Sequence, residues 1–151
     1  MWRKSRTKDD SAIVELCLAL DAEDPGPVPV SAANMRRTLR ALRAKPLRGR
    51  VLVLELGHEV CGYALVTSVW SNELGGLIDV IDELYVGPER RGQQHATRLI
   101  RAMARRSGPL ASKAVALTLE VRQDNRRARR LYRRLGFRGE NVVMHRRLRA
   151  R

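Results

Sequence analysis

The stretch from residue 77 to Met103 changes its hydrophobic period across one Gly-Pro pair, and this change constrains the fold more than any other feature. Residues 77–86 (LIDVIDELYV) are apolar and β-branched with interspersed acids, which favours a central strand. Gly87-Pro88 ends the strand, because proline cannot donate to a sheet ladder. Beyond the turn, one face of an amphipathic helix is formed by Ala96, Leu99, Ile100 and Met103. Gly108-Pro109 is predicted to end that helix.

The turn from Arg90 to His95 therefore precedes a helix N-terminus. The first amides of a helix have no intrahelical acceptor and lie at the positive end of its dipole, so a pyrophosphate group can bind there. Arg90 and Arg91 add positive charge. Taken alone, the segment is equally compatible with an ordinary basic turn whose arginines are solvated.

A second strand-and-helix unit follows at residues 114–135. In 114–121 (AVALTLEV) the larger apolar residues alternate with a small-residue face that also carries Glu120. Asp124 or Asn125 is predicted to cap the next helix, whose buried stripe consists of Ala128, Leu131, Tyr132 and Leu135. Gly136 suits the left-handed position past the helix end. The residues alone leave two interpretations open. Tyr132 could pack in the core while Glu120 pairs with an arginine at the strand edge, or both polar groups could face a cleft.

The two segments, in this order and about thirty residues apart, resemble the cofactor half of the Gcn5-related N-acetyltransferase (GNAT) family. This family moves an acetyl group from acetyl-CoA to an amine. Its phosphate-binding pattern, Arg/Gln-x-x-Gly-x-Gly/Ala, aligns with Arg91–Ala96, with Gln94 at a position where the family has glycine. Its later pattern, Asn-x-x-Ala-x-x-Leu-Tyr-x-x-x-Gly-Phe, is matched in full by Asn125, Ala128, Leu131, Tyr132, Gly136 and Phe137.

The resemblance implies that the pyrophosphate of acetyl-CoA binds to Arg91, Gly92, Gln93, Gln94, His95, Ala96 and Thr97. It also implies that Asn125 contacts the pantetheine arm and that Tyr132 is the acid that protonates the departing thiolate. A backbone amide near Leu84, Tyr85 and Val86 is expected to stabilise the tetrahedral oxyanion. We expect Gln94 to be tolerated with helical torsions, although glycine would let the backbone approach the phosphates more closely.

Two carboxylates are candidates for the base that deprotonates the amine. Glu120 is the first choice, because a glutamate at this place has that role in the similar ribosomal-protein N-terminal acetyltransferases. Glu83 is the alternative, and its other interpretation is a salt bridge to an arginine. A cationic acceptor, such as a small amine, a polyamine, an aminoglycoside or a peptide amine, is the hypothesis suggested by Glu73, Asp79, Asp82 and Glu83. Tyr85 is a candidate for lining the acceptor channel.

The remaining patterns complete an α/β order of β-α-α-β-β-β-α-β-α-β in one domain, residues 1–151. An N-terminal strand leads into helices at 11–22 and 32–44. Further strands are predicted at 50–56, 60–69 and 141–148. The resemblance implies a mixed, mostly antiparallel sheet flanked by helices, which splays after the fourth strand to admit the thioester.

Charge is distributed unevenly along the chain. Residues 1–89 carry 11 basic and 13 acidic side chains, a net charge of −2, whereas residues 90–151 carry 19 basic and 3 acidic, a net charge of +16. A CoA-binding half needs some positive charge for the phosphates, but less than this. The excess keeps open a second hypothesis, a non-catalytic basic module that binds RNA or acts as an adaptor.

Other features indicate the compartment and exclude some cofactors. No apolar run approaches membrane-spanning length and the N-terminus has no signal-peptide core, which predicts a cytoplasmic protein with no membrane contact. Cys17 and Cys61 lack motif spacing and are predicted to be buried thiols. No metal site is expected from the isolated His58, His95 and His145. Homodimers are frequent among the similar proteins, so a dimer is compatible with the resemblance.

Overall fold

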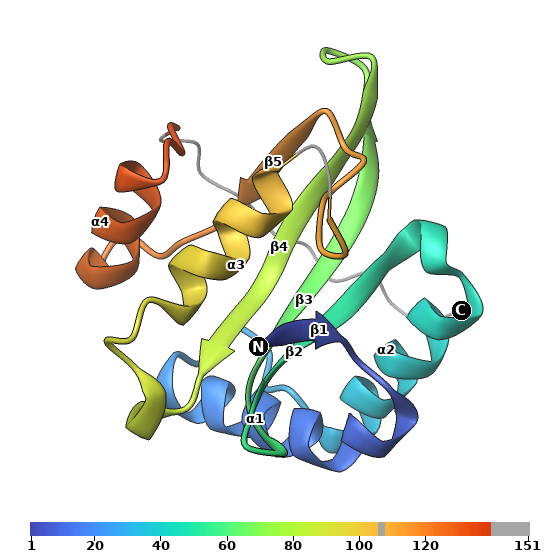
Figure 1. Ribbon diagram of the computed structural model, residues 1–151, viewed down its shortest axis with the longest axis vertical. Coiled ribbons are helices and arrows are strands. Elements are labelled where there is room, and N and C mark those ends of the chain that lie inside the picture. Colours follow the sequence, from blue (N-terminus) through green and yellow to red (C-terminus); the bar gives the residue numbers. More distant parts are fainter. Residues whose placement is uncertain (106–107, 140–151) are drawn as a thin grey trace.

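The computed structural model describes residues 1–105 and 108–139 and has the predicted element order through the last helix (Figure 1). Its strands are β1 (Trp2–Lys4), β2 (Gly49–Leu56), β3 (Glu59–Ser71), β4 (Gly76–Val86) and β5 (Ala116–Leu119). Its α-helices are α1 (Asp10–Glu23), α2 (Ala32–Ala44), α3 (His95–Ala104) and α4 (Arg126–Arg134). Short 3-10 turns occupy Thr7–Asp9, Pro46–Arg48 and Pro88–Arg90. The strand predicted at 141–148 lies outside the described residues.

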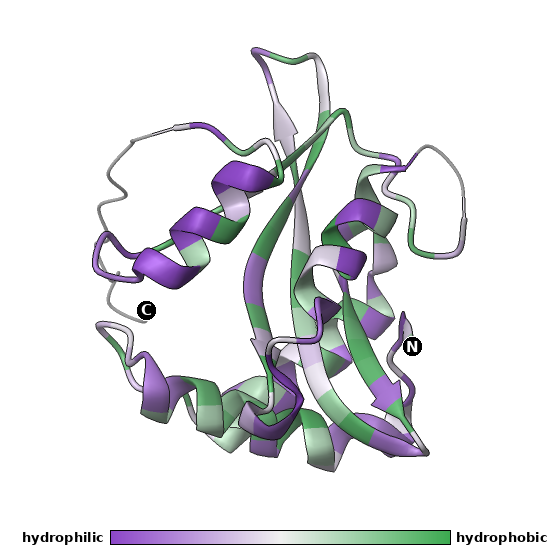
Figure 2. Cartoon of the chain, turned by 60° about the vertical axis from the view of Figure 1, so that its left-hand side comes forward, coloured by the Kyte–Doolittle hydropathy of each residue, from purple (hydrophilic) through white to green (hydrophobic). Residues whose placement is uncertain are grey.

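The strands form one mixed sheet in the order β1-β2-β3-β4-β5, antiparallel except for the parallel pair β4–β5. Helices cover both faces (Figure 1). One face packs α1 and α2 over a cluster that includes Cys17, Leu39 and Tyr63. The other packs α3 over a cluster that includes Leu52, Val66 and Leu99. The central strands are therefore apolar on both sides, as the mostly hydrophobic colouring of the sheet shows (Figure 2).

Two buried carboxylates tie the sheet to its surroundings. Asp9, only 3% exposed, accepts hydrogen bonds from both terminal nitrogens of Arg3 at 2.7 and 2.9 Å. Arg3 also pairs with Glu55 on β2, and its guanidinium lowers the pKa of Asp9 and brings that of Glu55 to about 2. Asp79 on β4, also 3% exposed, accepts from Arg50, Ser68 and Ser112. These ion pairs, together with the hydrogen bond from Ser68 on β3, fix β1, β2, β3 and β4 relative to one another.

Strand β4 changes its pairing on both sides at the same level. On the β3 side, Leu65 pairs with Glu83 and Val66 pairs with Ile81, so Asp82 is an extra residue in a β-bulge. On the β5 side, pairing stops at Ile81 opposite Leu119, although β4 continues to Val86. The splay that the resemblance implied after the fourth strand is therefore present.

Three predicted elements have different boundaries in the structure. Helix α3 ends at Ala104, before Gly108-Pro109, because Arg105 has extended torsions (φ −71°, ψ 150°). The chain then turns back, and the amide of Ser112 donates to the carbonyl of Met103. Strand β5 spans Ala116–Leu119 and is shorter than the predicted 114–121. Strand β3 extends two residues beyond its predicted end, and the other predicted elements within the described residues agree with the structure to within one residue at each end.

Candidate active site

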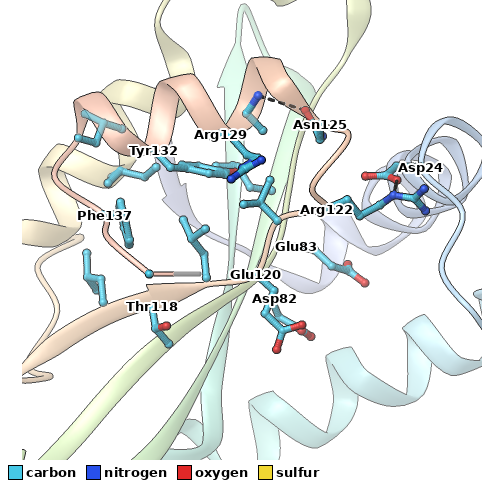
Figure 3. Close-up of a pocket in the computed structure, with 18 of the residues that line it drawn as sticks. Asp24, Asp82, Glu83, Thr118, Glu120, Arg122, Asn125, Arg129, Tyr132 and Phe137 are labelled. Carbon is cyan, nitrogen blue, oxygen red and sulfur yellow. Dashed lines mark hydrogen bonds and ion pairs between the residues drawn. The ribbon is translucent and has the colours of Figure 1, made fainter. Parts of the chain in front are cut away.

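A cavity of about 1340 Å³ lies where β4 and β5 diverge (Figure 3). One wall comes from β4 at Asp82, Glu83 and Leu84, and the opposite wall comes from α4. Helix α1 and the loop after it contribute Cys17, Leu20, Asp21, Asp24, Gly26, Val28 and Val30. Strand β5 and its following loop line the cavity from Leu117 to Gln123. Both sequence segments therefore contribute residues to one cavity, although the turn from Arg90 to Thr97 is not part of its lining.

Backbone amides of β4 point into the gap that β5 leaves open. Gly87 donates to the carbonyl of Cys61 on β3, so alternation directs the Tyr85 amide toward β3 as well. The amides of Leu84 and Val86 then point the other way, past the last pair with β5. The arrangement brings two of the three predicted amides to the gap and leaves out that of Tyr85.

The turn before α3 has the geometry of an anion-binding site. Among the described residues, no protein acceptor is within hydrogen-bond distance of the amides from Gly92 to Thr97, and the first helical bond runs from Arg98 to Gln94. Gly92 has a left-handed backbone with φ 81°, which glycine adopts without strain. Gln94 is also left-handed, with φ 61° and ψ 19°, so the prediction of helical torsions is wrong. This conformation costs a non-glycine residue about 1 kcal/mol.

The Arg91 guanidinium is engaged within the protein. Its Nε donates to the carbonyl of Val86 at 2.8 Å, and its Nη2 pairs with the carboxylate of Glu23 at 2.8 Å. It also lies over the ring of Tyr85, whose hydroxyl donates to Glu23. Arg91 therefore anchors the turn to β4 and α1. Tyr85 was a candidate for lining the acceptor channel, but it is buried and is not part of the cavity lining.

The first turn of α3 contains His95, Ala96 and Thr97. The backbone carbonyl of His95 accepts from the indole of Trp2 at 2.9 Å, which fixes the helix start against β1. The ring nitrogen Nε2 of His95 lies 3.3 Å from Oε1 of Gln93. Burial and the positive charge of Arg98 lower the pKa of His95, so the ring is neutral at pH 7 and adds no cation to the turn.

Helix α4 places Tyr132 on the cavity wall. The Asn125 side chain caps the helix by accepting from the amide of Ala128 at 3.1 Å, and Gly136 is left-handed with φ 93°, as predicted. Tyr132 packs edge-on against Phe137, with ring centroids 5.9 Å apart. Its hydroxyl has no hydrogen-bond partner among the described residues, and burial raises its pKa. The group is therefore a protonated phenol facing the cavity, able to act as an acid.

The two base candidates lie at the same cavity (Figure 3). Glu83 accepts a hydrogen bond from the Tyr63 hydroxyl at 2.7 Å, and burial raises the pKa of its carboxyl. Glu120 is exposed at the end of β5, beside Asp82. Partial burial and the negative charge of Glu120 raise the pKa of Asp82.

The acidic residues around the cavity differ from those predicted. Asp79 is a buried structural carboxylate, and Glu73 lies in the β3–β4 turn, so neither contributes to the acceptor side. Asp21 and Asp24 do line the cavity but were missed. The missed signal was a helical face ending in acids, formed by Cys17, Leu20, Asp21 and Asp24 at i, i+3, i+4 and i+7.

Arg122 joins the two sides of the cavity. Its Nε lies 3.3 Å from Oδ1 of Asp24, and its Nη1 donates to the carbonyl of Pro25 at 3.3 Å. It also pairs with Asp124 in its own loop at 2.9 Å. The loop after α1 is thereby connected to the segment between β5 and α4.

The described residues hold no group of three or more His, Cys, Asp or Glu side chains arranged to bind a metal ion. Cys17 and Cys61 are both buried and free, as predicted. Within residues 1–105 and 108–139, no helix has both the length and the apolar composition that are needed to cross a membrane.

The chain belongs to the GNAT acetyltransferase family, because the sequence model described as "Acetyltransferase (GNAT) family" matches residues 16–137. No curated protein matches the chain.

Solved structures share the fold over nearly their whole length. One is a possible acetyltransferase from Clostridium difficile 630, with TM-score 0.80, 20% identity, and coverage of 100% of this chain and 98% of that one. A ribosomal-protein-alanine N-acetyltransferase from Brucella melitensis biovar Abortus 2308 has TM-score 0.73, 18% identity and coverage of 98% and 99%. An acetyltransferase from Trypanosoma brucei has TM-score 0.69, 20% identity and coverage of 98% and 99%. At these identities the likeness concerns the fold alone.

Proposed function

We propose that the protein transfers the acetyl group of acetyl-CoA to an amine in the cavity between β4 and β5. The observation that carries this proposal is the meeting of three chemical groups in one cavity. A protonated Tyr132 lies on one wall, carboxylates lie on the opposite wall, and the amides of Leu84 and Val86 point into the gap. Acyl transfer from a thioester needs an acid, a base and oxyanion donors.

The described residues fit the parts of acetyl-CoA. The free amides from Gly92 to Thr97 would hold the pyrophosphate, and Asn125 and β4 would flank the pantetheine arm. Acetyl-CoA supplies an activated acyl group as a thioester. The role of Arg91 in this scheme is to hold the turn in place, since its guanidinium is already paired with Glu23.

In the proposed step, a carboxylate removes a proton from the ammonium form of the acceptor, and the neutral amine nitrogen then attacks the acetyl carbon. The amide of Leu84 or Val86 stabilises the oxyanion. The base first releases its proton to solvent and then accepts a second proton, from the amine adduct. The carbon–sulfur bond breaks, Tyr132 donates its proton to the thiolate, and the tyrosinate regains a proton from the base through solvent. The products are an N-acetyl amide and CoA thiol. Glu120 and Glu83 both line the cavity and are the two proposed bases.

We propose a cationic acceptor. Asp21, Asp24, Asp82, Glu83 and Glu120 border the cavity, whereas the α4 side carries Arg129, Arg133 and Arg138. This separation favours a cation near β4 and phosphates away from it. A polyamine, an aminoglycoside or the N-terminus of a basic peptide has this chemistry. The Brucella protein that shares this fold is a ribosomal-protein-alanine N-acetyltransferase, so an N-terminal alanine amine is a specific candidate to test.

Calorimetric titration with acetyl-CoA and a thiol-release screen over amines test this function. We expect acetyl-CoA binding, and CoA release with spermidine, an aminoglycoside or an alanyl peptide. Neutral and anionic amines are the matched control acceptors. Turnover of these controls alone would disprove the cationic acceptor. Absence of acetyl-CoA binding, together with strongly salt-dependent RNA binding, would instead support the basic-module hypothesis.

A further inference from the structure

Beneath the candidate base lies a tyrosine that the proposed mechanism does not use. Tyr63, in the middle of β3, is 0% exposed and sits in the apolar cluster between the sheet and α1. Its hydroxyl donates to Oε2 of Glu83 at 2.7 Å. Among the described residues, no other side chain or backbone donor contacts the Glu83 carboxylate. The hydroxyl is the single fixed partner of this carboxylate in that part of the chain.

The β-bulge places Glu83 within reach of Tyr63. Residues two apart on a strand normally share a face, yet Ile81 packs in the cluster under α3 and Tyr85 packs in the cluster under α1. The extra residue Asp82 produces this switch. Glu83 therefore shares the face of Tyr85, on the α1 side, where Cys17 and Asp21 line the cavity.

A tyrosine at this position is costly unless its hydroxyl has a hydrogen-bond partner. A buried hydroxyl loses its hydration, and only a hydrogen bond compensates for the loss. Phenylalanine would fill the same apolar space without this requirement. The bond to a half-buried carboxylate orients Glu83 at the cavity, whereas no hydrogen bond holds the carboxylate of the exposed Glu120 among the described residues.

We propose that Tyr63 is a positioning residue that holds Glu83 in place as the general base. This inference rests on the proposed acetyl transfer and selects Glu83 over Glu120. A base must lie within hydrogen-bond reach of the proton it removes, and a hydrogen-bonded oxygen on a bulged strand meets that requirement better than an exposed carboxylate that no hydrogen bond holds among the described residues. In this proposal, Tyr63 itself contacts neither substrate.

The titration of Glu83 reports on this contact. The groups that face it are Asp82 on β4, Asp21 and Cys17 on α1, and Tyr63 on β3, with Glu120 beyond Asp82. Burial raises the pKa of Glu83 first, and the neighbouring carboxylates raise it further, whereas the Tyr63 hydrogen bond lowers it. Tyr63→Phe removes the lowering contribution, so the pKa of Glu83 should increase. The acidic limb of the kcat/KM profile should move to higher pH in that variant.

Carboxyl carbon NMR of the full-length protein tests the contact without any acceptor. The Glu83 resonance is assigned by its absence in Glu83→Gln. We expect the titration midpoint of this resonance to rise in Tyr63→Phe and the other glutamate resonances to stay in place. An unchanged midpoint in a folded Tyr63→Phe protein would overturn the positioning role, whatever the enzyme acetylates.

Kinetics test the catalytic part, using acetyl-CoA with spermidine or an alanyl peptide as the acceptor. Glu83→Gln should reduce kcat/KM by about 100-fold and Tyr63→Phe by about tenfold at pH 7. In the Glu83→Gln background, Tyr63→Phe should cause no further loss, since it acts through Glu83. Full activity of Glu83→Gln with loss in Glu120→Gln would overturn the inference and leave the proposed function intact. Failure of wild-type protein to bind acetyl-CoA would defeat the proposed function instead.

Discussion

The two ends of the sheet, strands β1 to β3 on one side and strand β5 with helix α4 on the other, are built differently. Strands β2 and β3 contain fully buried side chains, including Leu52, Val53, Tyr63 and Val66, and buried ion pairs join their neighbours. In contrast, no residue of β5 or α4 is fully buried within the described part of the chain. Close packing at one end makes a rigid platform. Loose packing at the other leaves the gap that a long substrate arm needs, so this fold separates stability from substrate access.

Charge follows the same division. The first 89 residues carry a net charge of −2 and the remaining 62 carry +16. Helix α4 is predominantly hydrophilic, with arginines around its exposed faces (Figure 2). A packed core tolerates few unpaired charges, whereas an open helix accommodates many. The basic end is therefore the end where both structure and charge suit a phosphate-bearing substrate.

This difference predicts that substitutions at the end formed by β5 and α4 change the activity and have little effect on stability. Tyr132→Phe should lower kcat by about 100-fold, because the thiolate loses its proton donor, and leave the unfolding midpoint nearly unchanged. Steady-state thiol release and thermal denaturation measure the two quantities. Trp70→Phe is the control, since Trp70 is 68% exposed on β3 away from the cavity. Equal kcat in Tyr132→Phe and wild type across pH 7–9 would remove Tyr132 as an obligatory acid.

A pair of leucines tests the packing difference directly. Leu52→Ala on β2 should cost about 3 kcal/mol of unfolding free energy, because Leu52 is completely buried and leaves a cavity. Leu119→Ala on β5 should cost about 1 kcal/mol, since Leu119 is only partly buried. Urea denaturation measures both. Equal losses would show that the two ends are packed alike and would contradict the comparison.

Two arginines, Arg3 and Arg122, make ion pairs at opposite ends of the sheet. Arg3→Met should destabilise the protein by about 3 kcal/mol, because it leaves the buried Asp9 without its cationic partner. Arg122→Met should leave the unfolding midpoint unchanged, since its pairs with Asp24 and Asp124 are exposed. Chemical denaturation at low and high salt separates these cases. A large salt-dependent loss in Arg122→Met would mean that the bridge across the cavity holds the open end together.

Helix caps give the smallest expected effect. Asn125→Ala and Ser31→Ala each remove one cap, on α4 and α2, and should each cost about 1 kcal/mol. We expect only Asn125→Ala to weaken acetyl-CoA binding as well, because Asn125 lines the cavity and Ser31 does not. Calorimetric titration distinguishes them. Equal affinities in both variants would limit Asn125 to capping.

Local patterns predicted most of the elements, because periodicity and Gly-Pro breaks act over a few residues. The Asn125 cap and the left-handed Gly136 were found for the same reason. The bulge at Asp82 depends on pairing with β3, and the bond between Arg91 and Glu23 joins residues far apart in the chain. Neither has a local signal. Tyr63 was missed as well, since a tyrosine among apolar strand residues resembles ordinary core packing.

The divergence of β4 from both neighbours has one further consequence. Glu83 and Leu84 are consecutive, so one peptide unit links the side chain proposed to deprotonate the amine and an amide proposed to hold the oxyanion. The covalent geometry of the backbone keeps the Cα atoms of these two residues about 3.8 Å apart. If the proposed function holds, mutations that loosen β5 or α4 would change how well acetyl-CoA is held. In the proposed mechanism, the backbone positions of the base and of the oxyanion amide are set instead by a single strand.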